Sequence, residues 1–441
     1  ATANDALSTF SVDVDTASYS IATRSLDRGS RPDPSAVRTE EFINAQHYDY
    51  PDPGAEGPFA VLTELTPHPF VVDRHLLRVA LQAERQGAAA HKPVRLTFLV
   101  DVSGSMSNDD KLPLAQQALH LLVDGLGPED TAALATYAGR TEEVLLPTPA
   151  IRPGEIHAAI DALSSGGGTA MHSGFELAYD LAGRRFVAGV ENRVVVVSDG
   201  DANLGPVDHS AMLHTIAEQA ARGITLSTVG FGGGNYQDHR MEQLADRGDG
   251  NYSYIGSMAD ARRVFGRDLA ATLRTVARDV KLQVAFDEAA VQQYRLVGYE
   301  NRDIADADFR DDRVDAGEIG SGHTVTALYE LQLADPSAEH VADVHLRWEP
   351  PGPDGTATER VVPVLAGSAV HDFEAADNAT QLAVAAAALA EKLRGNAETR
   401  AWPWSRVEAI ARGAHRGDPE DDVLVRAIAA AARLEAVAAN R

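Results

Sequence analysis

Three separate stretches of the chain carry carboxylates or hydroxyls that could bind a ligand, directly after apolar or glycine-rich runs. The first, FLVDVSGSM, carries Asp101, Ser103 and Ser105 in a D-x-S-x-S pattern. The second, SSGGGTAMHSG, supplies Thr169 after three glycines, which allow the backbone to approach a neighbour closely. The third, VVVVSDGD, supplies Asp199 at the end of an apolar run. If these loops meet at one edge of a sheet, their oxygens converge.

Hydroxyl and carboxylate oxygens are hard ligands that suit Mg²⁺, with Mn²⁺ or Ca²⁺ as alternatives, rather than zinc or copper. Only two carboxylates would face the ion, so it would stay electrophilic and keep an open position. A carboxylate from another protein can fill that position. The competing interpretation is a helix cap and turn, where Ser and Asp are also favoured. The presence of all three loops favours the metal site.

Alternating strand and helix patterns must position these loops. From residue 92 to 275, apolar strand patterns such as VRLTFLV and RVVVV alternate with helical patterns such as KLPLAQQALHLLVDGL. This alternation predicts an α/β domain with a doubly wound, mostly parallel sheet. In such a sheet ligands bind at the carboxyl ends of the strands, near the point where the strand order reverses. The three loops are expected there.

The segments on either side of the α/β domain have a different pattern of apolar and polar residues. Residues 1–91 form an N-terminal segment whose strand patterns are expected to join a β-sandwich with residues 276–371, where alternating strands are separated by Gly, Asp and Pro turns. The α/β domain would then be inserted in the sandwich or flanked by it. Residues 372–441 are Ala-rich and helical in pattern. Trp402 and Trp404 are predicted to hold these helices against the body.

The composition excludes several classes of function. The 441 residues carry a formal net charge of −26, which disfavours nucleic acid as a partner because phosphate binding relies on basic patches. There is no cysteine, so disulfides and thiolate metal sites are excluded. No apolar run reaches the roughly 18–20 residues that span a bilayer. The chain starts at Ala1, so we expect that a signal or lipoprotein peptide has been removed, with a lipid anchor upstream of residue 1.

The three loops resemble the metal-ion-dependent adhesion site of the von Willebrand factor type A domain, and the resemblance covers roughly residues 92–272. It implies that the hydroxyls of Ser103, Ser105 and Thr169 face the metal. It also implies that the carboxylates of Asp101 and Asp199 bind the ion directly or through water.

Further segments, among them STFSVDVDTASYS, MEQLADRGDGNYSYI and VGYENRDIADADFRDD, resemble the bacterial YfbK-like family. Members of this family combine a characteristic N-terminal segment, a type A domain and a C-terminal region. The resemblance implies a secreted or envelope-associated protein without an established reaction.

These observations support one main hypothesis, a non-enzymatic adhesion-type module of the bacterial cell envelope that binds an Asp or Glu of a partner protein through Mg²⁺. The first alternative is an intracellular assembly factor that works with an ATPase. The second is a metal-dependent hydrolase, which would need a general base that the sequence does not place. Residues 301–318 hold seven acids, which indicate either a solvated loop or a second cation site.

Overall fold

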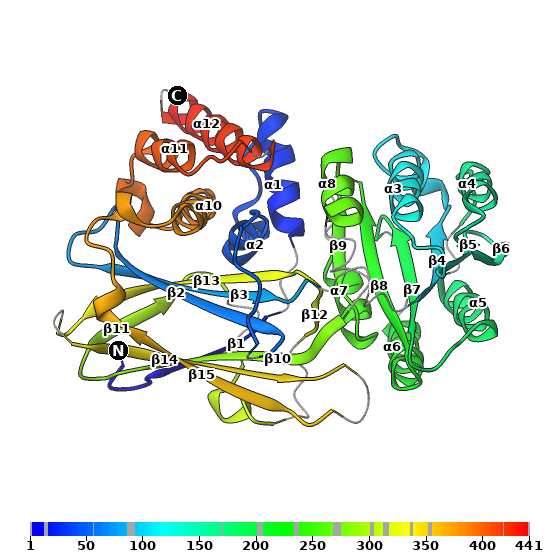
Figure 1. Ribbon diagram of the computed structural model, residues 1–441. Helices are drawn as coiled ribbons and strands as arrows, with labels where there is room; N and C mark the ends of the chain where they lie inside the picture. The colour runs from blue at the N-terminus through cyan, green and yellow to red at the C-terminus, as the bar shows by residue number, and fades with distance from the viewer. Residues whose placement is uncertain are drawn as a thin grey trace. The chain divides into compact units, whose positions relative to one another are not determined.

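The chain forms two units, and the sequence of the second is inserted in the sequence of the first. Unit 1 comprises Ala1–Arg85 and Val276–Arg441, and unit 2 comprises Gln86–Thr275 (Figure 1). The computed structural model describes every residue except 1, 13–15, 56, 86–92, 169–170, 201–205, 233–237, 268–274, 300–303, 312–316, 336–337, 352–354, 418 and 440–441.

Unit 2 is built on a six-stranded sheet with the order β6-β5-β4-β7-β8-β9. All neighbouring pairs are parallel except β5 and β6, which are antiparallel. The first strand, β4, lies in the middle of the sheet, with β5 on one side and β7 on the other. The strand order therefore reverses at β4. The strands are β4 (Val94–Asp101), β5 (Thr131–Tyr137), β6 (Thr141–Pro149), β7 (Glu191–Ser198), β8 (Ile224–Phe231) and β9 (Tyr252–Ile255).

Helices cover both faces of this sheet (Figure 1). The apolar sides of α3, α4 and α8 share one buried cluster with side chains of β4, β5, β7 and β8. Helix α5 packs against β4 and β5, and α6 and α7 pack against β8. The helices are α3 (Leu112–Asp124), α4 (Pro153–Asp161), α5 (Met171–Arg184), α6 (Pro206–Ala221), α7 (Asp238–Arg247) and α8 (Met258–Arg262), with a 3-10 turn η3 (Gly104–Ser107) and a π-helical turn η4 (Arg263–Arg267).

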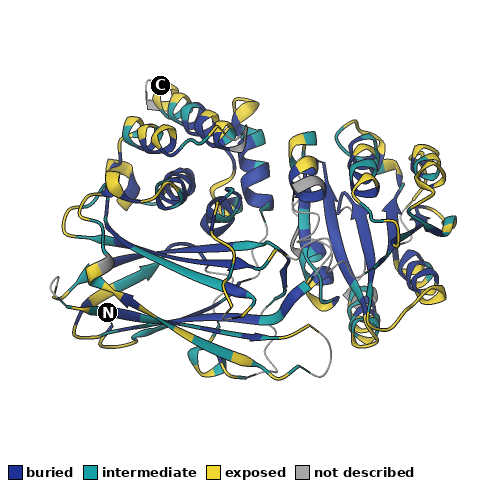
Figure 2. Cartoon of the chain, viewed as in Figure 1, coloured by how far each residue is buried: buried dark blue, intermediate teal, exposed yellow. Residues whose placement is uncertain are grey.

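Burial of the strands follows from this covering. Val194, Val195, Val196 and Val197 of β7 are all buried, because a central parallel strand has helices on both faces (Figure 2). Strand β6 was not predicted from the sequence. Its sequence TEEVLLPTP contains acids and prolines, which an edge strand tolerates because one side of its backbone is unpaired.

Unit 1 contains a two-sheet sandwich. Strands from the N-terminal and the C-terminal segments share both sheets: β1 pairs with β10, and β3 pairs with β13. One sheet has the order β1-β10-β14-β15 with β12 beside β10, and the other has the order β11-β13-β3-β2. The strands are β1 (Leu7–Ser11), β2 (Phe59–Pro67), β3 (His75–Ala83), β10 (Thr275–Phe286), β11 (Val291–Leu296), β12 (Ile319–Gly320), β13 (Thr324–Leu333), β14 (His340–Glu349) and β15 (Thr358–Leu365).

A helical layer covers the outer face of the four-stranded sheet. Strand β3 is buried along nearly its whole length because Leu77 and Val79 face the sandwich core while Leu76 and Ala80 face the helices. The helices are α1 (Ala17–Asp27), α2 (Thr39–Asn44), α10 (Asn378–Arg394), α11 (Trp404–Gly413) and α12 (Pro419–Ala439). The 3-10 turns are η1 (Pro34–Ala36), η5 (Asp306–Asp308), η6 (Ala366–Ser368), η7 (Phe373–Ala375) and η8 (Glu398–Ala401).

The predicted fold class is confirmed: a doubly wound α/β sheet lies within a chain that also carries a β-sandwich and a helical C-terminal region. The predicted role of Trp402 is also confirmed, since it stacks on Phe70 with ring centroids 4.5 Å apart. The contact of Trp404 lies within the helical region, where the Lys392 ammonium of α10 is 4.6 Å from its ring. Within the described part of the chain, no helix combines the length and the apolar character that crossing a membrane requires.

Candidate metal centre

The D-x-S-x-S loop leaves the carboxyl end of β4. Asp101 is the last residue of that strand, and the chain then turns through Ser103 into the 3-10 turn that contains Ser105. The Oγ atoms of Ser103 and Ser105 lie 3.0 Å apart. The loop therefore presents two adjacent hydroxyls next to a carboxylate, as the spacing predicts.

The Asp101 carboxylate is fully buried, and both of its oxygens accept hydrogen bonds. The backbone N–H of Ser103 donates to Oδ1 at 2.8 Å. The hydroxyls of Ser198 and Tyr137 donate to Oδ2 at 3.0 and 3.1 Å. Burial raises the pKa of the Asp101 carboxyl, the hydrogen bonds from Ser103 and Ser198 act in the opposite direction, and the nearby Asp199 raises the pKa further. These donors fix the orientation of the carboxylate.

The glycine-rich loop is hydrogen-bonded to the D-x-S-x-S loop. The N–H of Gly166 donates to the carbonyl oxygen of Val102 at 2.7 Å, and the N–H of Gly104 donates to the carbonyl oxygen of Gly167 at 3.1 Å. Gly167 has φ +87°, and a Cβ there would lie 3.2 Å from the backbone nitrogen of Gly139, so glycine permits this close approach. Thr169 follows two residues later and lies outside the described residues.

The third loop leaves β7, the strand beside β4. Asp199 follows the last residue of β7, and its side chain is only 1% exposed. The ammonium of Lys111, which precedes α3, lies 2.7 Å from Asp199 Oδ2. Gly232, at the end of β8, has φ +89°, and a Cβ there would lie 2.7 Å from Lys111 Cε. The lysine side chain can therefore pass beside Gly232 to reach the carboxylate, because Gly232 has no Cβ.

The donor set fits a small divalent cation that prefers oxygen. In an octahedral shell with metal–oxygen distances of about 2.1 Å, neighbouring ligand oxygens lie about 3 Å apart. The two serine hydroxyls have this separation. With Lys111 paired to Asp199, the two carboxylates and the ammonium sum to a formal charge of −1, which leaves a divalent cation incompletely neutralised. Such a site favours a further anionic ligand.

Three further residues belong to this centre and were not predicted from the sequence: Tyr137, Ser198 and Lys111. Tyr137 ends β5 directly opposite Asp101 in the parallel register, so strand pairing was needed to find it. Ser198 immediately precedes Asp199, so its place in the sequence could have indicated the hydroxyl that orients Asp101. Nothing in the sequence near Lys111 indicates that it pairs with a residue 88 positions away.

A comparison with known proteins shows the family of the chain. A protein from Escherichia coli (strain K12), named "Uncharacterized protein YfbK", is 36% identical in an alignment 445 residues long, which covers 95% of this chain and 76% of that protein. The chain belongs to the YfbK family. Models of three families match this YfbK-family chain: "von Willebrand factor" at residues 1–78, "von Willebrand factor type A domain" at 96–266, and "Uncharacterized protein YfbK, C-terminal" at 271–432.

More distant similarities extend to other bacteria. "Uncharacterized protein sll0103" from Synechocystis is 30% identical over 193 residues, 43% of this YfbK-family chain and 44% of that protein. The solved structure "von Willebrand factor type A from Catenulispora acidiphila" is 18% identical, with 82% of this chain and 88% of that chain covered and a TM-score of 0.48. None of these similarities indicates a function.

The described residues hold no group of three or more His, Asp or Glu side chains placed to hold a metal ion, and the candidate centre itself contributes only the carboxylates of Asp101 and Asp199. The acidic stretch 301–318 is described only in part. The carboxylate of Asp306 accepts a hydrogen bond from the Thr9 hydroxyl at 2.6 Å, and Lys281 donates to the carbonyl oxygen of Asp311 at 2.7 Å. A second cation site in this stretch stays a prediction, because residues 301–303 and 312–316 lie outside the described part.

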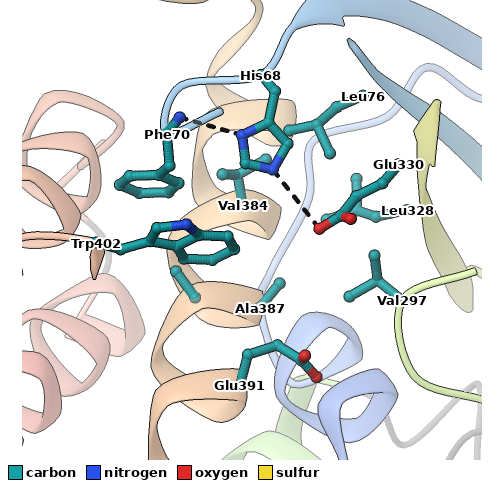
Figure 3. A pocket seen from close by; sticks show the side chains of 11 residues that line it. His68, Phe70, Leu76, Val297, Leu328, Glu330, Val384, Ala387, Glu391 and Trp402 are labelled. Atoms are coloured by element: carbon teal, nitrogen blue, oxygen red, sulfur yellow. Dashed lines mark hydrogen bonds and ion pairs between the residues drawn. The ribbon is translucent and has the colours of Figure 1, made fainter. Parts of the chain in front are cut away.

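Unit 1 of this YfbK-family chain also contains a small cavity between the four-stranded sheet and α10 (Figure 3). Its volume of about 20 Å³ suits one water molecule rather than an organic ligand. His68 Nδ1 accepts the backbone N–H groups of Phe70 and Val71, both at 3.1 Å, so its Nε2–H points to Glu330 Oε1 at 3.6 Å. We therefore assign this cavity a structural role.

Glu330 is the charged centre of the cavity wall. Arg295 binds both carboxylate oxygens, with Nη2–Oε1 at 2.7 Å and Nε–Oε2 at 3.2 Å, and it also lies 3.4 Å from Glu391 Oε2. Burial alone would raise the pKa of Glu330, but the contacts with His68 and Arg295 outweigh it and lower the pKa to about 2. The wall contains an ion-pair network that joins β11, β13 and α10, in which the two carboxylates are buried and the Arg295 side chain is 37% exposed.

Proposed function

We propose that this chain is a metal-ion-dependent protein-binding module of the bacterial cell envelope. Mg²⁺, or alternatively Mn²⁺ or Ca²⁺, binds to Asp101, Ser103, Ser105, Thr169 and Asp199. A carboxylate from an Asp or Glu of the partner protein completes the coordination. The observation that carries the proposal is the convergence of the hydroxyls of Ser103 and Ser105, 3.0 Å apart, with two buried carboxylates at the carboxyl ends of neighbouring parallel strands.

The charge balance supports a binding role rather than metal storage. Two carboxylates, one of them shared with Lys111, leave the ion short of negative charge, so an incoming carboxylate gains a strong electrostatic interaction. A hydrolase would need a base beside a metal-bound water. Asp101 is oriented by three donors and fully buried, so it is unsuited to exchange protons with a substrate. The envelope location is part of the proposal and rests on the family resemblance alone.

The test is a calorimetric titration of the full chain with Mg²⁺, Mn²⁺ and Ca²⁺, each with and without an acidic peptide. We expect weak cation binding, with a dissociation constant on the order of 10⁻⁴–10⁻³ M, tightened by the peptide. Asp101→Ala should abolish both effects, whereas Glu155→Ala, which removes an exposed carboxylate on α4 outside the centre, should preserve them. No cation binding in the wild type, or cation binding that the peptide does not tighten, would contradict the proposal.

The compartment needs its own observation. The envelope hypothesis predicts a signal sequence, or a lipoprotein signal with its cysteine, in the gene upstream of Ala1. A cytoplasmic gene product that copurifies with an ATPase would instead favour the assembly-factor alternative.

A further inference from the structure

Two histidines of unit 2 face each other on neighbouring helices. His120 lies on α3 and His157 on α4, and their Nδ1 atoms are 2.5 Å apart. The ring centroids are 4.7 Å apart, with 39° between the ring planes. The side-chain amide of Gln116 donates to the carbonyl oxygens of Ile160 and Leu163 at 2.9 and 3.3 Å, which holds α3 against the end of α4. The pair is thus built on two fixed helices.

The outer nitrogen of each ring faces a carboxylate. His120 Nε2 lies 2.9 Å from Asp161 Oδ1, and His157 Nε2 lies 3.0 Å from Asp124 Oδ1. An ionised carboxylate only accepts hydrogen bonds, so both Nε2 atoms carry hydrogen. A neutral imidazole protonated at Nε2 has a lone pair on Nδ1. At 2.5 Å, one proton shared between the two Nδ1 atoms satisfies both lone pairs. A metal ion that takes the place of this proton would satisfy them in the same way.

We propose that His120 and His157 bind a late first-row divalent metal ion, such as Zn²⁺, Ni²⁺ or Cu²⁺, through their Nδ1 atoms. Imidazole is a favoured ligand of these ions. A carboxylate on the other ring nitrogen is the usual second partner of a metal-bound histidine, because it fixes the tautomer and makes the ligand nitrogen more basic. Asp161 and Asp124 supply this contact on both sides of the pair.

Metal binding requires a small opening of the pair. With metal–nitrogen distances of about 2.05 Å and a tetrahedral angle, the two Nδ1 atoms would lie about 3.3 Å apart. The side chains of His120 and His157 are 27% and 24% exposed, so the rings have room to turn and water reaches the ion. Within the described residues the pair supplies two ligands, and water fills the remaining positions. Because this site offers nitrogen and the predicted Mg²⁺ centre offers only oxygen, the two sites select different ions.

The experiment is a calorimetric titration of metal-free full chain with Zn²⁺ or Ni²⁺, with Mg²⁺ present in excess to saturate oxygen sites. The wild type should bind one equivalent, and His120→Gln and His157→Gln should each weaken this binding at least tenfold. His214→Gln is the matched control, since His214 is a more exposed histidine on α6 with a carboxylate 3.3 Å from its Nε2. Asp101→Ala should also bind as the wild type does, which separates this site from the proposed Mg²⁺ centre.

Three results would overturn the proposal: no binding by the wild type, unchanged binding by either pair variant, or an equal loss in His214→Gln or Asp101→Ala. A second readout needs no variant. The electron paramagnetic resonance spectrum of the wild type with one equivalent of Cu²⁺ should show two imidazole nitrogens bound to the metal. A spectrum without nitrogen coupling would mean that the ion binds elsewhere, and it would refute a metal site at His120 and His157.

Discussion

Replacing Glu330 by glutamine should destabilise unit 1 by a measurable, pH-dependent amount. The carboxyl has an ordinary pKa of 4.5 and a folded-state pKa of about 2. Each unit of difference corresponds to about 1.4 kcal/mol, so the ionised form contributes about 3 kcal/mol of stability at neutral pH. Because the folded pKa is the lower one, this contribution is complete above about pH 4.5 and disappears as the pH falls toward 2.

Glu330→Gln keeps the shape of the side chain but removes the charge that holds Arg295. We expect the free energy of unfolding to fall by roughly 2–4 kcal/mol at pH 7. The difference between variant and wild type should shrink as the pH falls from 5 to 2. Urea unfolding followed by tryptophan fluorescence is the assay, because Trp348, Trp402 and Trp404 are the three tryptophans of the chain and all belong to unit 1. The signal therefore reports this unit by itself.

Glu359→Gln provides the matched control. The pKa of Glu359 is also lowered to about 2, chiefly by a hydrogen bond from Arg310, but the Arg310 side chain is 62% exposed and solvent screens the pair. We expect this variant to lose less than about 1 kcal/mol. Equal losses of stability in the two variants, or a loss caused by Glu330→Gln that is as large at pH 3 as at pH 7, would contradict a stabilising charge on Glu330.

Three further predictions concern single side chains. Lys111→Met should lower the melting temperature of the metal-free protein, because the buried Asp199 carboxylate loses its counter-charge. The rise in melting temperature on adding Mg²⁺ should be larger than in the wild type. An unchanged rise would contradict this prediction. Tyr137→Phe should cost about 1 kcal/mol in chemical unfolding and weaken Mg²⁺ binding roughly tenfold in calorimetry, because Asp101 loses an orienting donor. Asp377→Ala should cost roughly 2–4 kcal/mol in urea unfolding, because its side chain caps α10 and also pairs with the buried guanidinium of Arg78 at 2.8 Å.

Local sequence patterns were sufficient for the α/β architecture of unit 2. Apolar runs such as that of β7 indicate buried parallel strands, and the intervening amphipathic patterns indicate covering helices. The D-x-S-x-S loop and Asp199 could be predicted as neighbours because each follows such a strand and the carboxyl ends of parallel strands meet at one edge. Strand β6 was missed because its edge position tolerates acids and prolines that do not resemble a strand.

What only the tertiary structure decided is which distant residues meet. The pairing of Tyr137 with Asp101 depends on strand register, and the contact between Lys111 and Asp199 depends on the path of a loop beside a glycine. The facing of His120 and His157 depends on how two helices pack. Short sequence windows carry residue type and periodicity, and these determine which elements form. Contacts between elements depend on register and packing angle, which arise only when the whole core is assembled.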